Sequence, residues 1–137
     1  MDPVNNFLIV SGSTGGGRGS GHLLIFDRVA QGNTPPLGVI SGSHAALGGG
    51  GGLRVYPPRG WILVGQSGGG RASDASYVGV WSIKDRGDVP PRWTIGGPNG
   101  MLRQPRGLEI NAQDQTIIVS DKFLNAVMTY SFPEFFR

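Results

Sequence analysis

Gly96–Phe132, GGPNGMLRQPRGLEINAQDQTIIVSDKFLNAVMTYSF, carries the clearest signal of the fold. Three short runs in it, Gly107–Ile110, Thr116–Val119 and Ala126–Tyr130, are rich in β-branched and aromatic residues. Clusters of Pro, Gly, Asn and Asp separate the runs. Short strand-forming runs divided by turn-forming residues are typical of an antiparallel meander, so this stretch predicts three consecutive strands.

The order of residues in this meander resembles a blade of an NHL-type β-propeller. Pro105-x-Gly107 precedes an apolar strand, Ile118-Val-Ser-Asp121 ends the next, and Asn125-Ala-Val opens a third that contains an aromatic residue. Similar features occur along nearly the whole chain. The resemblance implies a series of such blades, with the function on a propeller face rather than in one motif.

A regular spacing connects the remainder of the chain to this blade. Ile40, Leu47 and Val64 recur as Ile95, Leu102 and Val119, all at the same offset. Asn33–Pro36 recurs as Asp88–Pro91 at that offset too, and Ile9-Val10 recurs as Leu63-Val64 at an offset one shorter. A period near 50 with several strands per unit is typical of propeller blades.

The repeat predicts ten strands, divided among the blades as three, four and three. They are Phe7–Val10, Leu23–Asp27, Leu37–Ser41, Leu53–Tyr56, Trp61–Val64, Val78–Ile83, Arg92–Ile95, Gly107–Ile110, Thr116–Ser120 and Ala126–Phe132. The expected fold class is therefore all-β: a partial β-propeller of four-stranded antiparallel blades, part of a six-bladed propeller. The single segment 1–137 divides into a partial blade at 2–42, a complete blade at 43–97 and a partial blade at 98–137.

An arc of three blades leaves two sheet faces uncovered, which predicts that it is not stable as a monomer. Either the chain is a segment of a longer propeller, which the sequence favours, or two copies supply six blades in a head-to-tail ring. Asp2–Asn6 is interpreted as the turn that follows an inner strand. The expected partners are thus neighbouring blades or another protein.

Composition excludes several classes of protein. The chain contains no cysteine, which excludes disulfides and Cys-ligated metals, and no cofactor is predicted. The apolar run Phe7–Val10 is too short for a signal peptide or a membrane span. An upstream targeting signal is left open, and the compartment stays undetermined. Binding of nucleic acid is not expected despite the basic pI, because the tryptophans fall inside strands rather than among exposed cations.

The loops sort onto two ends of the sheets, because consecutive antiparallel strands alternate in direction. One end, with a net charge of +3, carries two matching strings, Gly15-Gly-Gly-Arg18 and Gly68-Gly-Gly-Arg71, with Lys122 in the third such loop. The loops at the other end, which include Asp2–Asn6, Pro57–Gly60 and Lys84–Pro91, carry charges that sum to zero. Cations around one end of a propeller could attract an anionic ligand or an acidic surface. The candidate ligand-binding residues are Arg18, Arg71, Lys122, Arg103, Arg106 and His44.

Catalytic and metal motifs are weak. Gly65-Gln-Ser67-Gly-Gly69 fits G-x-S-x-G, but a nucleophile elbow needs a helix where Gly68–Gly70 stands, so Ser67 is interpreted as part of a solvated turn. The glycine run Gly48–Gly52 is interpreted as a crossing between blades and not as a phosphate loop. Glu109 is the only acid within an inner strand, and its neighbours point it away from the packed face, so no catalytic or metal-binding residue is assigned.

These observations favour a non-catalytic propeller module that binds or assembles, with protein, carbohydrate or an anionic ligand as its partner. Two alternatives remain open. The resemblance also covers calcium-dependent lactonases, which would make the chain a hydrolase. The third possibility is a structural subunit whose open blade edges are capped by neighbours in a larger complex.

Overall fold

The structure is a computed structural model that describes residues 1–14, 19–48, 50–67 and 76–137. The described part of the chain contains ten strands, which confirms the predicted number and order. Their bounds are β1 Phe7–Ser13, β2 Gly21–Asp27, β3 Gly38–Ser41, β4 Gly50–Tyr56, β5 Trp61–Gln66, β6 Tyr77–Ser82, β7 Trp93–Gly96, β8 Pro105–Asn111, β9 Thr116–Asp121 and β10 Ala126–Ser131. The short helices are α1 Gly97–Gly100 and α2 Pro133–Phe136.

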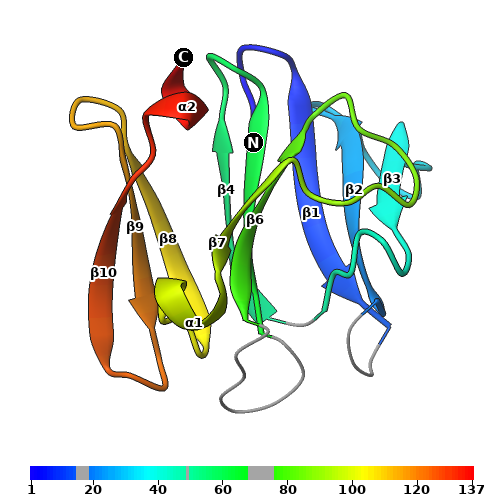
Figure 1. Cartoon of the computed structure of the whole chain (residues 1–137). Coiled ribbons are helices and arrows are strands. Elements are labelled where there is room, and N and C mark those ends of the chain that lie inside the picture. The colour runs from blue at the N-terminus through cyan, green and yellow to red at the C-terminus, as the bar shows by residue number, and fades with distance from the viewer. Residues whose placement is uncertain (15–18, 49, 68–75) are drawn as a thin grey trace.

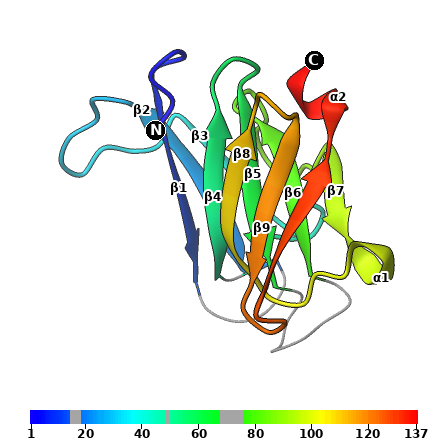
Figure 2. The same ribbon diagram turned by 90° about the vertical axis from the view of Figure 1, so that its left-hand side faces the viewer.

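The strands form three separate antiparallel sheets. Their orders are β1-β2-β3, β4-β5-β6-β7 and β10-β9-β8, so each strand pairs with its neighbours in the sequence. The sheets stand side by side in chain order, with β4–β7 between the other two (Figures 1 and 2). The β9–β10 turn lies at the lower end in Figure 1, and the turns β4–β5 and β8–β9 lie at the upper end.

Two apolar cores fill the spaces between the sheets. In the first, Ile9, Leu23 and Ile25 of the first sheet pack with Ile62 and Trp81 of the second. In the second, alternate residues of the middle sheet pack against β8–β10; this core includes Leu63, Val78, Val80, Leu108, Ile117 and Val119. Successive side chains of a strand point to opposite faces, so the middle sheet contributes to both cores. It is the sheet that is covered on each side.

The repeat extends to the backbone conformation. Asn6, Gly60 and Gln115, at the last position of three successive turns, all have a positive φ, of 62°, 65° and 56°. Gly32 with Gly87, and Ala46 with Met101, are further positive-φ pairs at the offset that relates Ile40 to Ile95. Left-handed backbone is uncommon outside glycine, so its recurrence in register shows that the three units share turn geometry as well as strands.

The N-terminal residues form the same kind of turn, as the sequence predicted. Asp2 pairs with Phe7 in an antiparallel bridge, in the position that Tyr56 and Trp61 occupy in the middle sheet. The buried carboxylate of Asp2 accepts hydrogen bonds from the backbone N–H groups of Val4 and Asn5, at 3.1 and 2.9 Å.

The connection between β6 and β7 differs from its predicted path. The sorting of loops placed Lys84–Pro91 at the upper end, but this loop descends along the outer edge of β3 (Figure 1). Gly87 forms a parallel bridge with Ile40, and its N–H donates to the carbonyl of Val39 at 2.7 Å. The free backbone groups at the edge of β3 are thereby paired, which neither loop length nor charge indicates.

The interpretation of the glycine run also needed correction. Gly50–Gly52 belong to β4 and are not only a crossing between sheets. The aromatic C-terminal segment packs in the second core through α2. Phe135 is fully buried there, and its carbonyl accepts the Nε1–H of Trp61 at 3.0 Å.

Candidate functional site: a cationic hollow at the upper end

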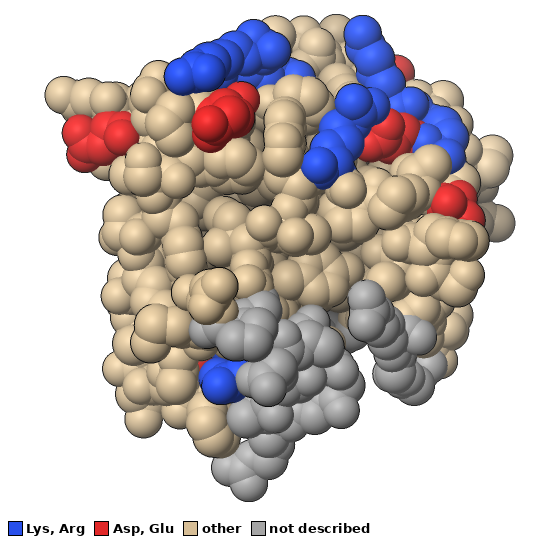
Figure 3. All heavy atoms as spheres, in the orientation of Figure 1, with Lys and Arg blue, Asp and Glu red and all other residues tan. Residues whose placement is uncertain are grey.

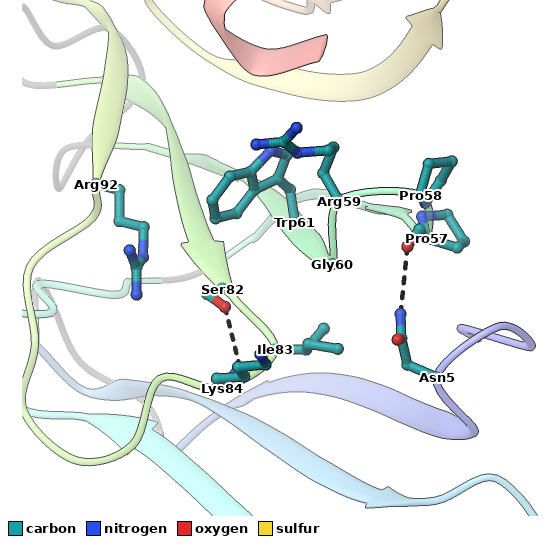
Figure 4. A pocket seen from close by; sticks show the side chains of 10 residues that line it. All are labelled: Asn5, Pro57, Pro58, Arg59, Gly60, Trp61, Ser82, Ile83, Lys84 and Arg92. Carbon is teal, nitrogen blue, oxygen red and sulfur yellow. Dashed lines mark hydrogen bonds between the residues drawn. The ribbon is translucent and has the colours of Figure 1, made fainter. Parts of the chain in front are cut away.

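Lys and Arg side chains gather along the upper end of the molecule (Figure 3). Beneath them, three turns enclose a hollow of about 540 Å³ between the first and second sheets (Figure 4). The residues that line it are Asn5, Pro57, Pro58, Arg59, Gly60, Trp61, Ser82, Ile83, Lys84 and Arg92. Its volume is within the range of small-molecule sites.

Hydrogen bonds hold the three turns together. Gly60 accepts the N–H of Ile83 at 2.9 Å, which joins the β4–β5 turn to the β6–β7 loop. Across the gap between sheets, the side-chain amide of Asn5 donates to the carbonyl of Pro57 at 3.2 Å. Hydrogen bonds thus join the walls of the hollow to one another, and the side chains of Arg59 and Lys84 extend from turns that are held in place.

Arg92 is held in place by an ion pair. Its Nη2 and Nε donate to the two carboxylate oxygens of Asp85, at 2.7 and 3.2 Å, and its guanidinium lies 5.7 Å from the centre of the Trp61 ring. Burial raises the pKa of Asp85, but the hydrogen bond from Arg92 and that from the Ser82 N–H outweigh it, so this pKa is lowered. The same hydrogen bond raises the pKa of Arg92.

Arg59 and Lys84 give the hollow its charge. Both are exposed, and within the described part of the chain neither forms an ion pair. Because Asp85 neutralises Arg92, these two side chains leave the hollow with an excess of about two positive charges at neutral pH. Such an excess in a concave site attracts anions.

The lower end holds the candidates that the sequence predicted. Arg106 and Lys122 line a second hollow of about 390 Å³ at one end of β9 and β10, together with Asp121. Arg103 is nearby, since its N–H donates to Asp121 at 2.7 Å. Arg18 and Arg71 lie outside the described residues. The structure therefore brings three of the six candidates together, around a buried acid whose pKa is raised by burial and lowered overall by backbone N–H donors.

His44, the sixth candidate, pairs with an acid of the β6–β7 loop. Its Nδ1 lies 2.8 Å from Oδ2 of Asp88, whose Oδ1 accepts the N–H groups of His44 and Ala45 at 2.7 and 2.9 Å. The hydrogen bonds from Ala45 and then from His44 lower the pKa of Asp88 to about 2. This cluster joins the β6–β7 loop to the end of the first sheet, so the imidazole already has a structural contact.

Among the residues of the weaker motifs, the structure describes Glu109 and Ser67. Glu109 is exposed on the open face of β8 and lies 3.7 Å from Nε of Arg54, which agrees with its predicted direction. The hydroxyl of Ser67 is buried rather than solvated. Among the residues that the structure describes, no group of three His, Asp or Glu side chains could hold a metal ion.

Sequence reasoning missed the upper hollow because it summed charges without knowing their partners. Asp2, Asp85 and Asp88 were counted against the upper cations. In the structure Asp2 caps its own turn, Asp85 binds Arg92, and Asp88 contacts the lower part of the first sheet. The signal that was present is the proximity of Arg59 and Trp61, which follow the two prolines of one tight turn.

No helix of the described residues has the length and apolar character that a membrane crossing would need. Comparisons of the chain with models of protein families, with curated proteins and with solved structures found no match.

Proposed function

We propose that the chain is a partial β-propeller of the NHL-like kind and that it acts as a non-catalytic binding and assembly module. Three antiparallel sheets in chain order, a regular repeat of strands along the sequence and left-handed turn positions in register support the propeller assignment. Assembly is supported by the face of the first sheet that no other sheet covers.

The uncovered face of β1–β3 carries apolar side chains where the middle sheet is buried. Leu8 is opposite Phe26 in the first sheet, as Ile62 is opposite Trp81 in the second. Ile62 and Trp81 are fully buried, whereas Leu8 and Phe26 are partly exposed. The exposed fraction of Val10 is 41%, against 2% for its counterpart Val64. This contrast is the observation that carries the proposal, because contiguous apolar surface on a soluble domain marks an interaction site.

The open face of β8–β10 also carries apolar side chains and could pack against the open face of β1–β3. In β8–β10, Ile118 and Val127 occupy the positions of Leu63 and Val78, which pack against the following sheet. Val127 is 69% exposed. A second copy of the chain is therefore the proposed occupant of the β1–β3 face. It would place its β8–β10 face there, as β4–β7 packs on β8–β10 within one chain, and two copies joined in this way would bring together six sheets.

The test is the mass in solution, measured by size-exclusion chromatography with light scattering. We expect a species of twice 14.4 kDa, and expect Val10→Glu or Val127→Glu alone to yield monomers. Val29→Glu, at a 70% exposed position in the β2–β3 loop, is the matched control and should stay dimeric. An equimolar mixture of the two Glu variants keeps one intact junction and should recover some dimer. A wild type that is monomeric and has the circular dichroism spectrum of a folded β protein would overturn the proposal.

A further inference from the structure

We propose that the cationic hollow at the upper end binds a phosphate or sulfate monoester, with the oxyanion held by Arg59, Lys84 and Arg92. The proposal does not depend on the assembly of the sheets, because every lining residue belongs to one chain. This site also differs from the anion-binding site that the sequence predicted at the lower end.

The first argument is the charge. Three cations from two turns line one hollow, and within the described residues only Arg92 has an acidic partner. Like charges that share a hollow repel one another, and the repulsion is relieved when an anion lies between them. The hydrogen bonds from Ile83 to Gly60 and from Asn5 to Pro57 keep the turns that carry them in place. The turns that carry the cations are thus held in place before any ligand arrives.

The second argument is the supply of hydrogen-bond donors. Asp85 engages Nε and Nη2 of Arg92, which leaves the Nη1 donors for a ligand. Arg59 adds a planar guanidinium and Lys84 adds an ammonium group. Guanidinium groups match the geometry of phosphate-type oxyanions, and charge-assisted hydrogen bonds are the stronger kind.

The third argument is the apolar wall. Trp61, Pro57, Pro58 and Ile83 line the same hollow as the cations (Figure 4). An inorganic anion would use only the cationic part, whereas the organic group of a monoester would also cover the indole and proline surfaces. The combination of several cations with a few apolar surfaces favours an ester over a free ion.

The experiment is isothermal titration calorimetry with phenyl phosphate, phenyl sulfate and inorganic phosphate as probes, at about 0.1 M salt so that distant charges are screened. We expect saturable binding of one or both esters, tighter than that of inorganic phosphate. The difference between the two esters identifies the source of the oxyanion. The indole N–H resonance of Trp61 should shift during the titration, which places the ligand in this hollow.

Arg59→Ala/Lys84→Ala should weaken binding at least about tenfold, as expected for the loss of two charge-assisted contacts. Arg106→Ala/Lys122→Ala removes the same charge from the lower hollow and should leave the affinity unchanged. Equal weakening by both pairs would show a general attraction to a basic protein and overturn the proposal. So would the absence of saturable binding, or binding of heparin or RNA without binding of either ester. None of these results depends on whether the chain is dimeric.

Discussion

The middle sheet and the first sheet have nearly the same strands but different surroundings. Trp81 and Phe26 occupy matching positions, each opposite an aliphatic residue of the neighbouring strand, yet Trp81 is fully buried and Phe26 is half-buried. The hydrophobic effect depends on the apolar area removed from water, so the same pattern stabilises one sheet more than the other. Stability in this fold therefore depends on what each sheet packs against.

Truncation of Trp81 and of Phe26 should give the greatest difference between the two sheets in the free energy of unfolding. Trp81→Ala should lower the free energy of unfolding by about 3–5 kcal/mol, because it opens a cavity in the first core and frees the carbonyl of Val89 from its 3.1 Å hydrogen bond. Phe26→Ala should cost less than half as much. The measurement is urea denaturation at low protein concentration, with Trp81→Phe as a milder variant if the alanine variant does not fold. Equal losses would show that the two sheets are equally well packed.

Substitutions in the turns of the two sheets should give a smaller difference in the free energy of unfolding. Gly60→Ala should destabilise the chain by about 1–2 kcal/mol, because φ is +65° and a Cβ would lie 3.1 Å from Ile83. Gly32→Ala has the same φ but no atom within 4 Å, so it should incur only the backbone strain. Thermal unfolding of the two variants separates these contributions. A smaller loss at Gly60 than at Gly32 would contradict the close packing of the middle sheet at its upper end.

The stability that comes from the contact of Asp88, in the β6–β7 loop, with His44 and Ala45 should depend on pH. The pKa of Asp88 falls from 3.8 to about 2 on folding, so the stability it confers is complete above about pH 4 and is lost as the pH falls toward 2. Asp88→Asn should therefore lose less stability than the wild type between pH 4 and pH 2. Urea denaturation across this range measures both slopes. Parallel slopes would mean that Asp88 does not hold the first sheet.

A substitution in the third sheet should change the free energy of unfolding by a still smaller amount. Gln115 has a φ of 56° at the turn position where the middle sheet has glycine. Gln115→Gly should raise the free energy of unfolding by up to about 1 kcal/mol, because glycine adopts this conformation without a Cβ clash. Differential scanning calorimetry can detect the gain. A loss would show that the Gln115 side chain makes a contact worth more than the strain.

Local patterns predicted the strands well. Thr116–Val119 consists of β-branched residues and is flanked by turn residues, and the structure has β9 at Thr116–Asp121 with Ile117 and Val119 inside the core. Strand pairing between neighbours in the sequence needs only short turns, so the order within each sheet also follows from the chain. The expectation that Ile40 and Ile95 are equivalent is consistent with the structure, since each packs in the core between its own sheet and the next.

The candidate sites were predicted less well. Lys122 and Arg106 do line one hollow, as expected of loops from the same end. The upper hollow was hidden because Asp85 and Asp88 appear in the sequence as counter-charges to Arg59 and Lys84. One acid binds Arg92 and the other reaches the first sheet. Net charge is additive along a chain, but the charge of a site depends on which side chains meet.

The ten strands and their grouping into three units follow from the chain alone, because they depend on residues within one unit and on a repeat that is visible in the sequence. The covered sheet faces, the course of the β6–β7 loop and the cations that share a hollow became known only from the folded molecule. Those features arise from contacts between units, such as Gly87 with Ile40 and Asn5 with Pro57, whose partners are distant in the sequence. No local pattern specifies such pairs, since their free energy depends on packing and on desolvation in the assembled chain.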